Sequence, residues 1–333
     1  MGRLLLPVVA VTAFLLVAVR KVPPYPSVNS ILIPSGAAAA TGNERSDPTD
    51  NTWIPPETFS PSVFSNVELG SSTLPGASER VLDDMSSTQT PPLLLIHGAW
   101  HGKWAFDEFF AGYLRQQGFE VHTIDLPEHG EKFTSVGQQR WLSIGDYVDA
   151  VAAYVETMPT PPVLVGHSMG GLVVQKYLET HSAPAGVLLA SVPPRGVWRI
   201  TLFMLSRHTL RFLTANLTLN LFHIVSDMGL TRELFFSEDI NPSDFEEYFG
   251  QLHGESYRAF LDMLLFALPR PSRVDAPMLV LGAENDVVFP PADVLATAAA
   301  YDTTATIFPQ MAHDMMLERE WQTVADAIVE WVQ

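Results

Sequence analysis

The chain has 333 residues, of which 47% are hydrophobic and 17% are charged, and its formal net charge is -18. This length suits one large domain or two small ones. The excess of 37 acidic over 19 basic side chains argues against a nucleic-acid binder, because such a protein needs a basic surface to neutralise phosphates. The sequence has no cysteine, which excludes a disulfide framework, a thiolate zinc site and a cysteine nucleophile.

The first apolar run extends from Leu4 to Val19 and is flanked by Arg3 and by Arg20. A helix that spans a bilayer needs roughly 17–25 residues, so this run is at the short end of that range. We expect residues 1–21 to be a signal anchor, a cleaved signal peptide or an organelle-targeting segment. The chain is then attached to a membrane by this one segment, or it is secretory or organellar if the segment is cleaved.

The composition changes between residues 22 and 90. Pro, Ser, Thr, Gly and acidic residues dominate there, and the apolar residues follow no period. Such a segment buries too little apolar surface to offset the entropy lost on ordering. We therefore predict a mostly disordered linker, followed by a folded domain over residues 91–333.

Short apolar runs alternate with segments of helical periodicity from Pro91 onward. Strands are predicted at 93–96, 120–124, 163–165, 186–190, 278–281 and 305–308, and helices at 104–117, 144–157 and 321–331. Short runs that are apolar throughout are typical of parallel strands buried on both faces. The alternation predicts an α/β fold with a mostly parallel central sheet that is covered by helices on both faces.

This alternation stops at about residues 193–273. The stretch contains no strand-like run, is unusually apolar and has largely helical periodicity. We therefore expect a helical cap inserted over one end of the sheet.

The strongest indication of chemistry is the sequence Gly-His-Ser-Met-Gly-Gly at residues 166–171, directly after a predicted strand and before a helical run. The glycines allow a sharp turn from strand to helix, which holds Ser168 in a strained and exposed position. The N-terminus of the helix favours negative charge that develops beside it. Ser168 is therefore the candidate nucleophile.

A second motif, His-Gly-Ala-Trp at residues 97–100, directly follows the first core strand. Attack of a serine on an ester carbonyl places negative charge on the carbonyl oxygen, and two backbone N–H groups must point at that oxygen. We expect one from Met169, the residue after the nucleophile, and the other from Ala99, with Trp100 as the alternative. His97 is expected to tie the loop down rather than to take part in chemistry.

Two further candidate groups follow the last two predicted strands. Asp286 comes after the fifth strand, two residues beyond Glu284, and His313 comes after the sixth, next to Asp314. Ligands and catalytic groups collect at the carboxyl ends of parallel strands. The chain order of Ser168, Asp286 and His313 fits a triad in which the histidine takes the serine proton and the acid orients the imidazole. Asp286 is the expected acid, with Glu284 and Asp314 as alternatives.

Together these motifs resemble the α/β-hydrolase fold over residues 91–333. The resemblance rests on residues 93–100, Asp-Leu-Pro-Glu-His-Gly at 125–130, the serine turn, Asp286, and Ala-His-Asp-Met-Met-Leu at 312–317. Within that superfamily the chain is similar to the esterase, lipase and C–C hydrolase branches that carry a helical cap. Haloalkane dehalogenases and epoxide hydrolases have an aspartate at the nucleophile position, which argues against those branches.

The resemblance implies a role for each candidate residue. It makes Ser168 the nucleophile, His313 the base, Asp286 the orienting acid, and Ala99 and Met169 the oxyanion donors. No metal or organic cofactor is expected. Many relatives have glycine where this chain has Glu128, a departure that touches no catalytic role.

The leading hypothesis is a serine hydrolase that cleaves a carboxylic ester through an acyl-enzyme intermediate. The apolar cap favours a small-molecule substrate with a hydrophobic or lipid-like group, and Trp100 and Trp104 either line its pocket or pack the loop. Thioester, amide and C–C substrates use the same triad. Two alternatives differ in function: a non-catalytic small-ligand receptor or scaffold of the same fold, and an acyltransferase.

Overall fold

The computed structural model describes residues 90–107 and 109–333. The expected targeting segment, residues 1–21, and the expected linker lie outside the described residues, apart from Thr90 at the end of the linker. Within the described ranges, no helix combines the length and the apolar character needed to cross a bilayer. Membrane attachment stays a prediction from the sequence.

Six parallel strands form the central sheet, in the order β2-β1-β3-β4-β5-β6. They are β1 (Leu93–Ile96), β2 (Val121–Ile124), β3 (Val163–His167), β4 (Gly186–Leu189), β5 (Met278–Ala283) and β6 (Ala305–Phe308). Every residue of β1, β3 and β4 is buried, which explains why these strands are apolar throughout rather than alternating. The predicted fold class is confirmed.

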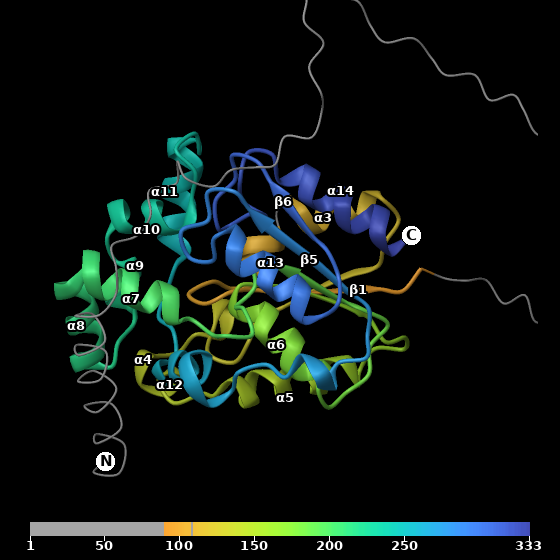
Figure 1. Cartoon of the computed structure of the whole chain (residues 1–333), viewed down its shortest axis with the longest axis horizontal. Coiled ribbons are helices and arrows are strands. Elements are labelled where there is room, and N and C mark those ends of the chain that lie inside the picture. Colours follow the sequence, from red (N-terminus) through yellow and green to blue (C-terminus); the bar gives the residue numbers. More distant parts are fainter. Residues whose placement is uncertain (1–89, 108) are drawn as a thin grey trace, which may run out of the picture. The chain divides into compact units, whose positions relative to one another are not determined.

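Helices cover both faces of the sheet (Figure 1). On one face, α3 (Phe110–Gln116) packs against α14 (Trp321–Val332). On the other face, α5 (Ile144–Val155) packs against α6 (Met169–Leu178), and α13 (Pro291–Ala300) packs on β5 and β6. Shorter elements complete this part: α2 (Trp104–Asp107), η3 (Gly130–Lys132) and α4 (Val136–Gln139).

Helices α2 and α3 together, α4 and α13 differ from the sequence prediction, and α4 was not predicted. The single helix predicted at 104–117 is divided into α2, which ends at Asp107, and α3, which begins at Phe110. Helix α13 was not predicted, although Pro291 in its first turn and its alanine-rich sequence are typical of a helix start and interior.

Between β4 and β5 the chain forms no strand, and its helices are here called the cap helices. They are α7 (Trp198–Arg207), α8 (Thr209–Thr218), α9 (Phe222–Val225), α10 (Met228–Phe235), α11 (Pro242–Gln251), α12 (Tyr257–Leu261), the π-helical turn η4 (Asp262–Phe266) and the 3-10 turn η5 (Pro271–Arg273). The side chains on one face of α7 are buried and those on the other are exposed, so α7 packs by one stripe. Figure 1 shows α7 to α11 grouped at one end of the sheet.

Candidate active site

The site lies where the strand order changes direction. Strand β1 lies between β2 and β3, and Ile96 at its end pairs with Gly166 of β3. The loops that follow β1 and β3 therefore leave neighbouring strand ends in the same direction. Such a switch point at the carboxyl ends of parallel strands is where open α/β sheets bind ligands.

Ser168 occupies a sharp turn between β3 and α6. Its φ is 51° and its ψ is -114°, a backbone conformation that is unfavourable for residues with a side chain. Gly170 allows α6 to approach β1, because a Cβ atom at this position would collide with the carbonyl oxygens of Ile96 and His97. The turn thus directs Ser168 away from the strand end, at the N-terminus of α6.

A continuous hydrogen-bonded chain joins the three candidate triad residues. The Nε2 atom of His313 lies 3.0 Å from the Oγ atom of Ser168, and its Nδ1 atom lies 2.8 Å from Oδ2 of Asp286. The other carboxylate oxygen, Oδ1, accepts the N–H groups of Val288 and Phe289 at 2.7 and 2.9 Å. Both oxygens of Asp286 are therefore occupied, and the carboxylate is fixed in orientation.

The two alternative acids have other partners. Glu284 is exposed and accepts the backbone N–H of Gln310 at 3.0 Å. Asp314 is buried, and its Oδ2 atom lies 3.0 Å from Nε2 of His101. Neither carboxylate therefore takes the place of Asp286 beside His313.

The protonation of His313 is set by two opposing effects. Burial disfavours the imidazolium and would lower the pKa of His313, but the charge of Asp286 and its hydrogen bond raise that pKa above its ordinary value of 6.5. A ring that donates from Nδ1 to the carboxylate has an unprotonated Nε2 in its neutral form. That nitrogen faces the hydroxyl group of Ser168 and can accept its proton.

His97 holds the loop after β1, here called the oxyanion loop (residues 97–101). Its Nε2 atom accepts the backbone N–H of Leu126 at 3.1 Å, so its Nδ1 atom carries the proton and donates to the carbonyl of Gly98 at 2.8 Å. Burial, followed by the charge of His129, lowers the pKa of His97 well below 6.5, which keeps this ring neutral. The peptide that carries the N–H of Ala99 is thereby held at its carbonyl end.

The two candidate donors in the oxyanion loop, Ala99 and Trp100, differ in their partners. No acceptor within residues 90–107 or 109–333 takes the N–H of Ala99 or that of Met169. The N–H of Trp100 instead points to Oε2 of Glu255 at 3.2 Å. The geometry thus leaves Ala99, rather than Trp100, with an N–H group that can serve an oxyanion.

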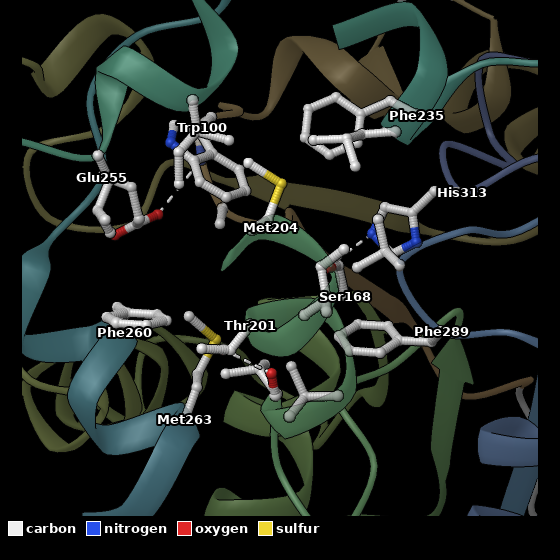
Figure 2. A pocket seen from close by; sticks show the side chains of 18 of the residues that line it. Trp100, Ser168, Thr201, Met204, Phe235, Glu255, Phe260, Met263, Phe289 and His313 are labelled. Atoms are coloured by element: carbon white, nitrogen blue, oxygen red, sulfur yellow. Dashed lines mark hydrogen bonds between the residues drawn. The ribbon is translucent and has the colours of Figure 1, made fainter. Parts of the chain in front are cut away.

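An apolar cavity opens beside Ser168 and His313 and has a volume of about 80 Å³ (Figure 2). The segment at residues 193–273, which contains the cap helices, supplies most of its wall. The lining residues from that region include Val197, Ile200, Thr201, Met204, Phe212, Leu221, Ile224, Leu234, Phe235, Phe260 and Met263. Trp100 also lines the cavity, whereas Trp104 is not among its lining residues and stacks on Tyr248 with ring centres 6.2 Å apart.

One group of side chains within the described residues could hold a metal ion. Donor atoms of His167, His313 and Asp314 lie within 4.8 Å of one another. Both nitrogens of His313 are already engaged by Ser168 and Asp286, and Nε2 of His167 faces the carbonyl of His313 at 3.0 Å. A metal here would compete with the triad for His313.

The structure shows how Glu128 is accommodated where many relatives have glycine. Its φ is 57°, the left-handed conformation that favours glycine. The Glu128 carboxylate accepts the N–H of Thr134 at 2.8 Å and is also bonded by the hydroxyl of that residue. These bonds stabilise the turn that a glycine would otherwise adopt without strain.

Comparison with known proteins agrees with this architecture. The model of the alpha/beta hydrolase family matches residues 93–327. Phospholipase YtpA from Bacillus subtilis is 28% identical over 207 residues, which cover 58% of this chain and 75% of that protein. Protein phosphatase methylesterase 1 from Rattus norvegicus is 33% identical over 107 residues, which cover 31% of this chain but only 26% of the relative.

Among solved structures, the monoacylglycerol lipase from Paleococcus ferrophilus superposes with a TM-score of 0.55. The match is 24% identical in sequence and covers 72% of this chain and 93% of the lipase. At this level of identity the likeness concerns the fold.

Sequence reasoning gave no role to Glu255 or His129, two buried residues beside the oxyanion loop. Their side chains meet at 2.9 Å although they are 126 positions apart in the sequence. His129 belongs to the Asp-Leu-Pro-Glu-His-Gly motif at residues 125–130, but Glu255 lies in no motif, so no local pattern could have identified the contact between them.

Proposed function

The chain belongs to the alpha/beta hydrolase family, and on that premise we propose that it is a serine hydrolase that cleaves a carboxylic ester through an acyl-enzyme intermediate. The observation that carries the proposal is the hydrogen-bonded chain Ser168–His313–Asp286 at the wall of an apolar cavity. Its esterase and lipase relatives support hydrolysis as the class of reaction.

In the first half of the reaction, Oγ of Ser168 attacks the ester carbonyl while Nε2 of His313 takes the hydroxyl proton. The carbonyl oxygen becomes negative and accepts the N–H groups of Ala99 and Met169. Asp286 stabilises the imidazolium that forms, and it keeps the ring in the required tautomer. His313 then gives its proton to the leaving alcohol as the C–O bond breaks, and the acyl group stays on Ser168.

In the second half, water takes the place of the alcohol. His313 removes a proton from the water, the resulting hydroxide attacks the acyl carbon, and the same two N–H groups stabilise the second oxyanion. The proton returns to Oγ of Ser168 as the carboxylic acid leaves. At the end of the cycle Ser168 again carries its proton, and His313 is again neutral.

We further propose that the substrate carries a hydrophobic acyl or alcohol group. Most side chains around the cavity are aliphatic, aromatic or methionine, and these surfaces favour a hydrocarbon chain that leaves water. The hydroxyl group of Thr201 is already committed to the carbonyl of Val197 at 2.7 Å. A charged or strongly polar substituent would find few partners there.

Turnover of nitrophenyl esters of increasing acyl length tests this proposal. We expect many product molecules per molecule of enzyme, and a preference for acyl chains long enough to occupy the apolar cavity. A receptor or scaffold would release product once or not at all, and such a result with folded protein would overturn the proposal. Addition of an alcohol acceptor distinguishes hydrolysis from acyl transfer, because a transferase would form a new ester rather than the free acid.

A further inference from the structure

Glu255 is a buried carboxylate in the segment that joins α11 to α12. Only 1% of its surface is exposed, yet it belongs to the wall of the cavity beside the candidate nucleophile. In Figure 2 it lies on the side of Trp100, away from Ser168 and His313. It therefore does not touch the reacting groups.

The carboxylate is fully satisfied by hydrogen bonds. Oε2 accepts the N–H of Trp100 at 3.2 Å and lies 2.9 Å from Nε2 of His129. Oε1 accepts the hydroxyl of Tyr147 at 3.1 Å and the N–H of Ser256 at 2.5 Å. Such complete satisfaction is what a carboxylate needs to stay ionised in an apolar surrounding.

His129 supplies the opposite charge. Its Nδ1 atom lies 2.9 Å from the carbonyl of Pro127 and its Nε2 atom faces the carboxylate, so both nitrogens meet acceptors and the ring donates from both. Burial would lower the pKa of His129, but the charge of Glu255 and their hydrogen bond raise it above its ordinary value. Burial would raise the pKa of Glu255, but the charge of His129 and the hydrogen bonds to the carboxylate outweigh burial and lower that pKa below its ordinary value.

Trp100 is the point at which this ion pair meets the oxyanion loop. Its φ of 66° lies in the left-handed region, which is strained for a residue with a bulky side chain. Its N–H donates to Glu255, and its carbonyl accepts the backbone N–H of His253 at 3.1 Å. The segment 253–255 therefore holds the strained residue by both of its backbone polar groups.

The peptide group between Ala99 and Trp100 is held on its other side as well. The carbonyl of Ala99 lies 2.7 Å from Nδ1 of His101, whose Nε2 atom lies 3.0 Å from Asp314. Asp314 adjoins His313 in the sequence, so the loop that carries the base also supports this peptide. A rotation of this peptide group would break two hydrogen bonds at once, the one from the Trp100 N–H to Glu255 and the one between the Ala99 carbonyl and His101.

We propose that Glu255 is a positioning residue for the oxyanion hole: by holding Trp100 in its left-handed conformation, it fixes the direction of the neighbouring Ala99 N–H. This inference rests on the proposed esterase function. A buried ion pair is on average no more stabilising than well-packed apolar side chains, so stability alone gives little reason for a charge at the cavity wall. A preorganised N–H donor, in contrast, contributes to the reaction only when its direction is fixed in advance.

Two variants of the full-length chain test the proposal. Glu255→Gln removes the charge, and Glu255→Asp keeps a charge opposite His129 while it shortens the reach toward Trp100. Tyr147→Phe is the matched control, because it removes a hydrogen bond to the same carboxylate but leaves the contact with Trp100. For each protein we would measure kcat and KM on one nitrophenyl ester, the thermal midpoint, and the affinity for an alkyl boronic acid, which forms a tetrahedral adduct on a serine hydroxyl.

We expect both Glu255 variants to lose at least about tenfold in kcat with KM changed less than threefold, since removal of a whole oxyanion donor costs about 10²–10³ in kcat. Affinity for the boronic acid should fall by a similar factor, because its adduct also needs the oxyanion donors, while Tyr147→Phe stays within threefold of the wild type. A role confined to stability would lower the thermal midpoint without this selective loss. If Glu255→Asp is folded and keeps wild-type kcat and boronic acid affinity, the inference is wrong, even if Glu255→Gln does not fold. Failure of the wild type to turn over any ester would instead contradict the proposed function.

Discussion

The Nδ1 atom of His313 and the Oδ2 atom of Asp286 lie 2.8 Å apart, at the ends of two neighbouring strands. Strand β5 leads to Asp286 and strand β6 leads to His313, and the two strands are paired up to Ala283 and Phe308. Since the parallel sheet brings these strand ends together, the acid and the base meet although 27 positions separate them in the chain. The sheet register, rather than the loops alone, determines this contact.

Asp286→Asn should lower kcat by about 10³–10⁴-fold, because an amide cannot stabilise the imidazolium and permits the wrong tautomer of His313. Glu284→Gln is the matched control, two residues away in the same turn, and should stay within about twofold of the wild type because the Glu284 side chain is exposed and bonds only the backbone of Gln310 among the described residues. Steady-state kinetics on one ester would check both. The reverse order of effects would exchange the roles of the two acids.

The pH dependence of kcat/KM should follow His313. Its pKa is raised above 6.5, so it becomes protonated, and unable to accept the serine proton, as the pH falls through that raised value. We therefore expect kcat/KM to be highest above this pKa and to fall tenfold per pH unit below it, with a midpoint above 6.5. Burial lowers the pKa of His167 to about 3, so this neighbouring ring stays neutral over the same range. Constant activity from pH 8 down to pH 5.5 would contradict the assignment of His313 as base.

Gly98→Ala should impair the oxyanion loop. A Cβ atom at this position would lie 2.8 Å from Nδ1 of His167 and 3.1 Å from Cβ of Ser168, so the loop or the serine must move. We expect a loss of at least about tenfold in kcat, in line with the cost of a misplaced oxyanion donor. Gly112→Ala is the control, since nothing lies near a Cβ atom there and alanine favours the helix α3. An unchanged kcat in Gly98→Ala would show that the loop tolerates displacement.

Phe260→Ala should shift the preference among acyl chains toward longer ones. Phe260 lines the cavity, and in Figure 2 it lies on the side opposite Phe289 and His313, so its removal extends the apolar space. The neighbouring Phe266→Ala is the control, because that ring is 59% exposed and does not line the cavity. The ratio of kcat/KM for a long and a short nitrophenyl ester would report the shift. An equal change in both variants would indicate that the cavity does not hold the acyl chain.

Much of this site follows from local sequence. The turn at Ser168 needs glycines on both sides, and the strands before Ser168 and Ala99 are apolar because they are buried on both faces. These requirements appear as short motifs, and for this reason the nucleophile, the base and the oxyanion loop could be proposed from residue patterns alone.

The contacts that hold the oxyanion loop in place could not be predicted from such motifs. The contact between Trp100 and Glu255 joins residues 155 positions apart, and it depends on how the segment between α11 and α12 returns to the sheet. The division of the predicted helix between Asp107 and Phe110 is likewise not marked by a glycine or a proline in the sequence. Long-range packing of this kind leaves no period or motif in the sequence.

The nucleophile is the central claim, and covalent labelling tests it most directly. The full-length chain would be treated with a fluorophosphonate probe, digested and analysed by mass spectrometry, beside the Ser168→Ala variant. We predict one adduct per chain, located on Ser168, and for the variant no adduct, no ester turnover and a thermal midpoint within about 2 °C of the wild type. An adduct on another residue, or a variant that keeps most of its turnover, would contradict the account.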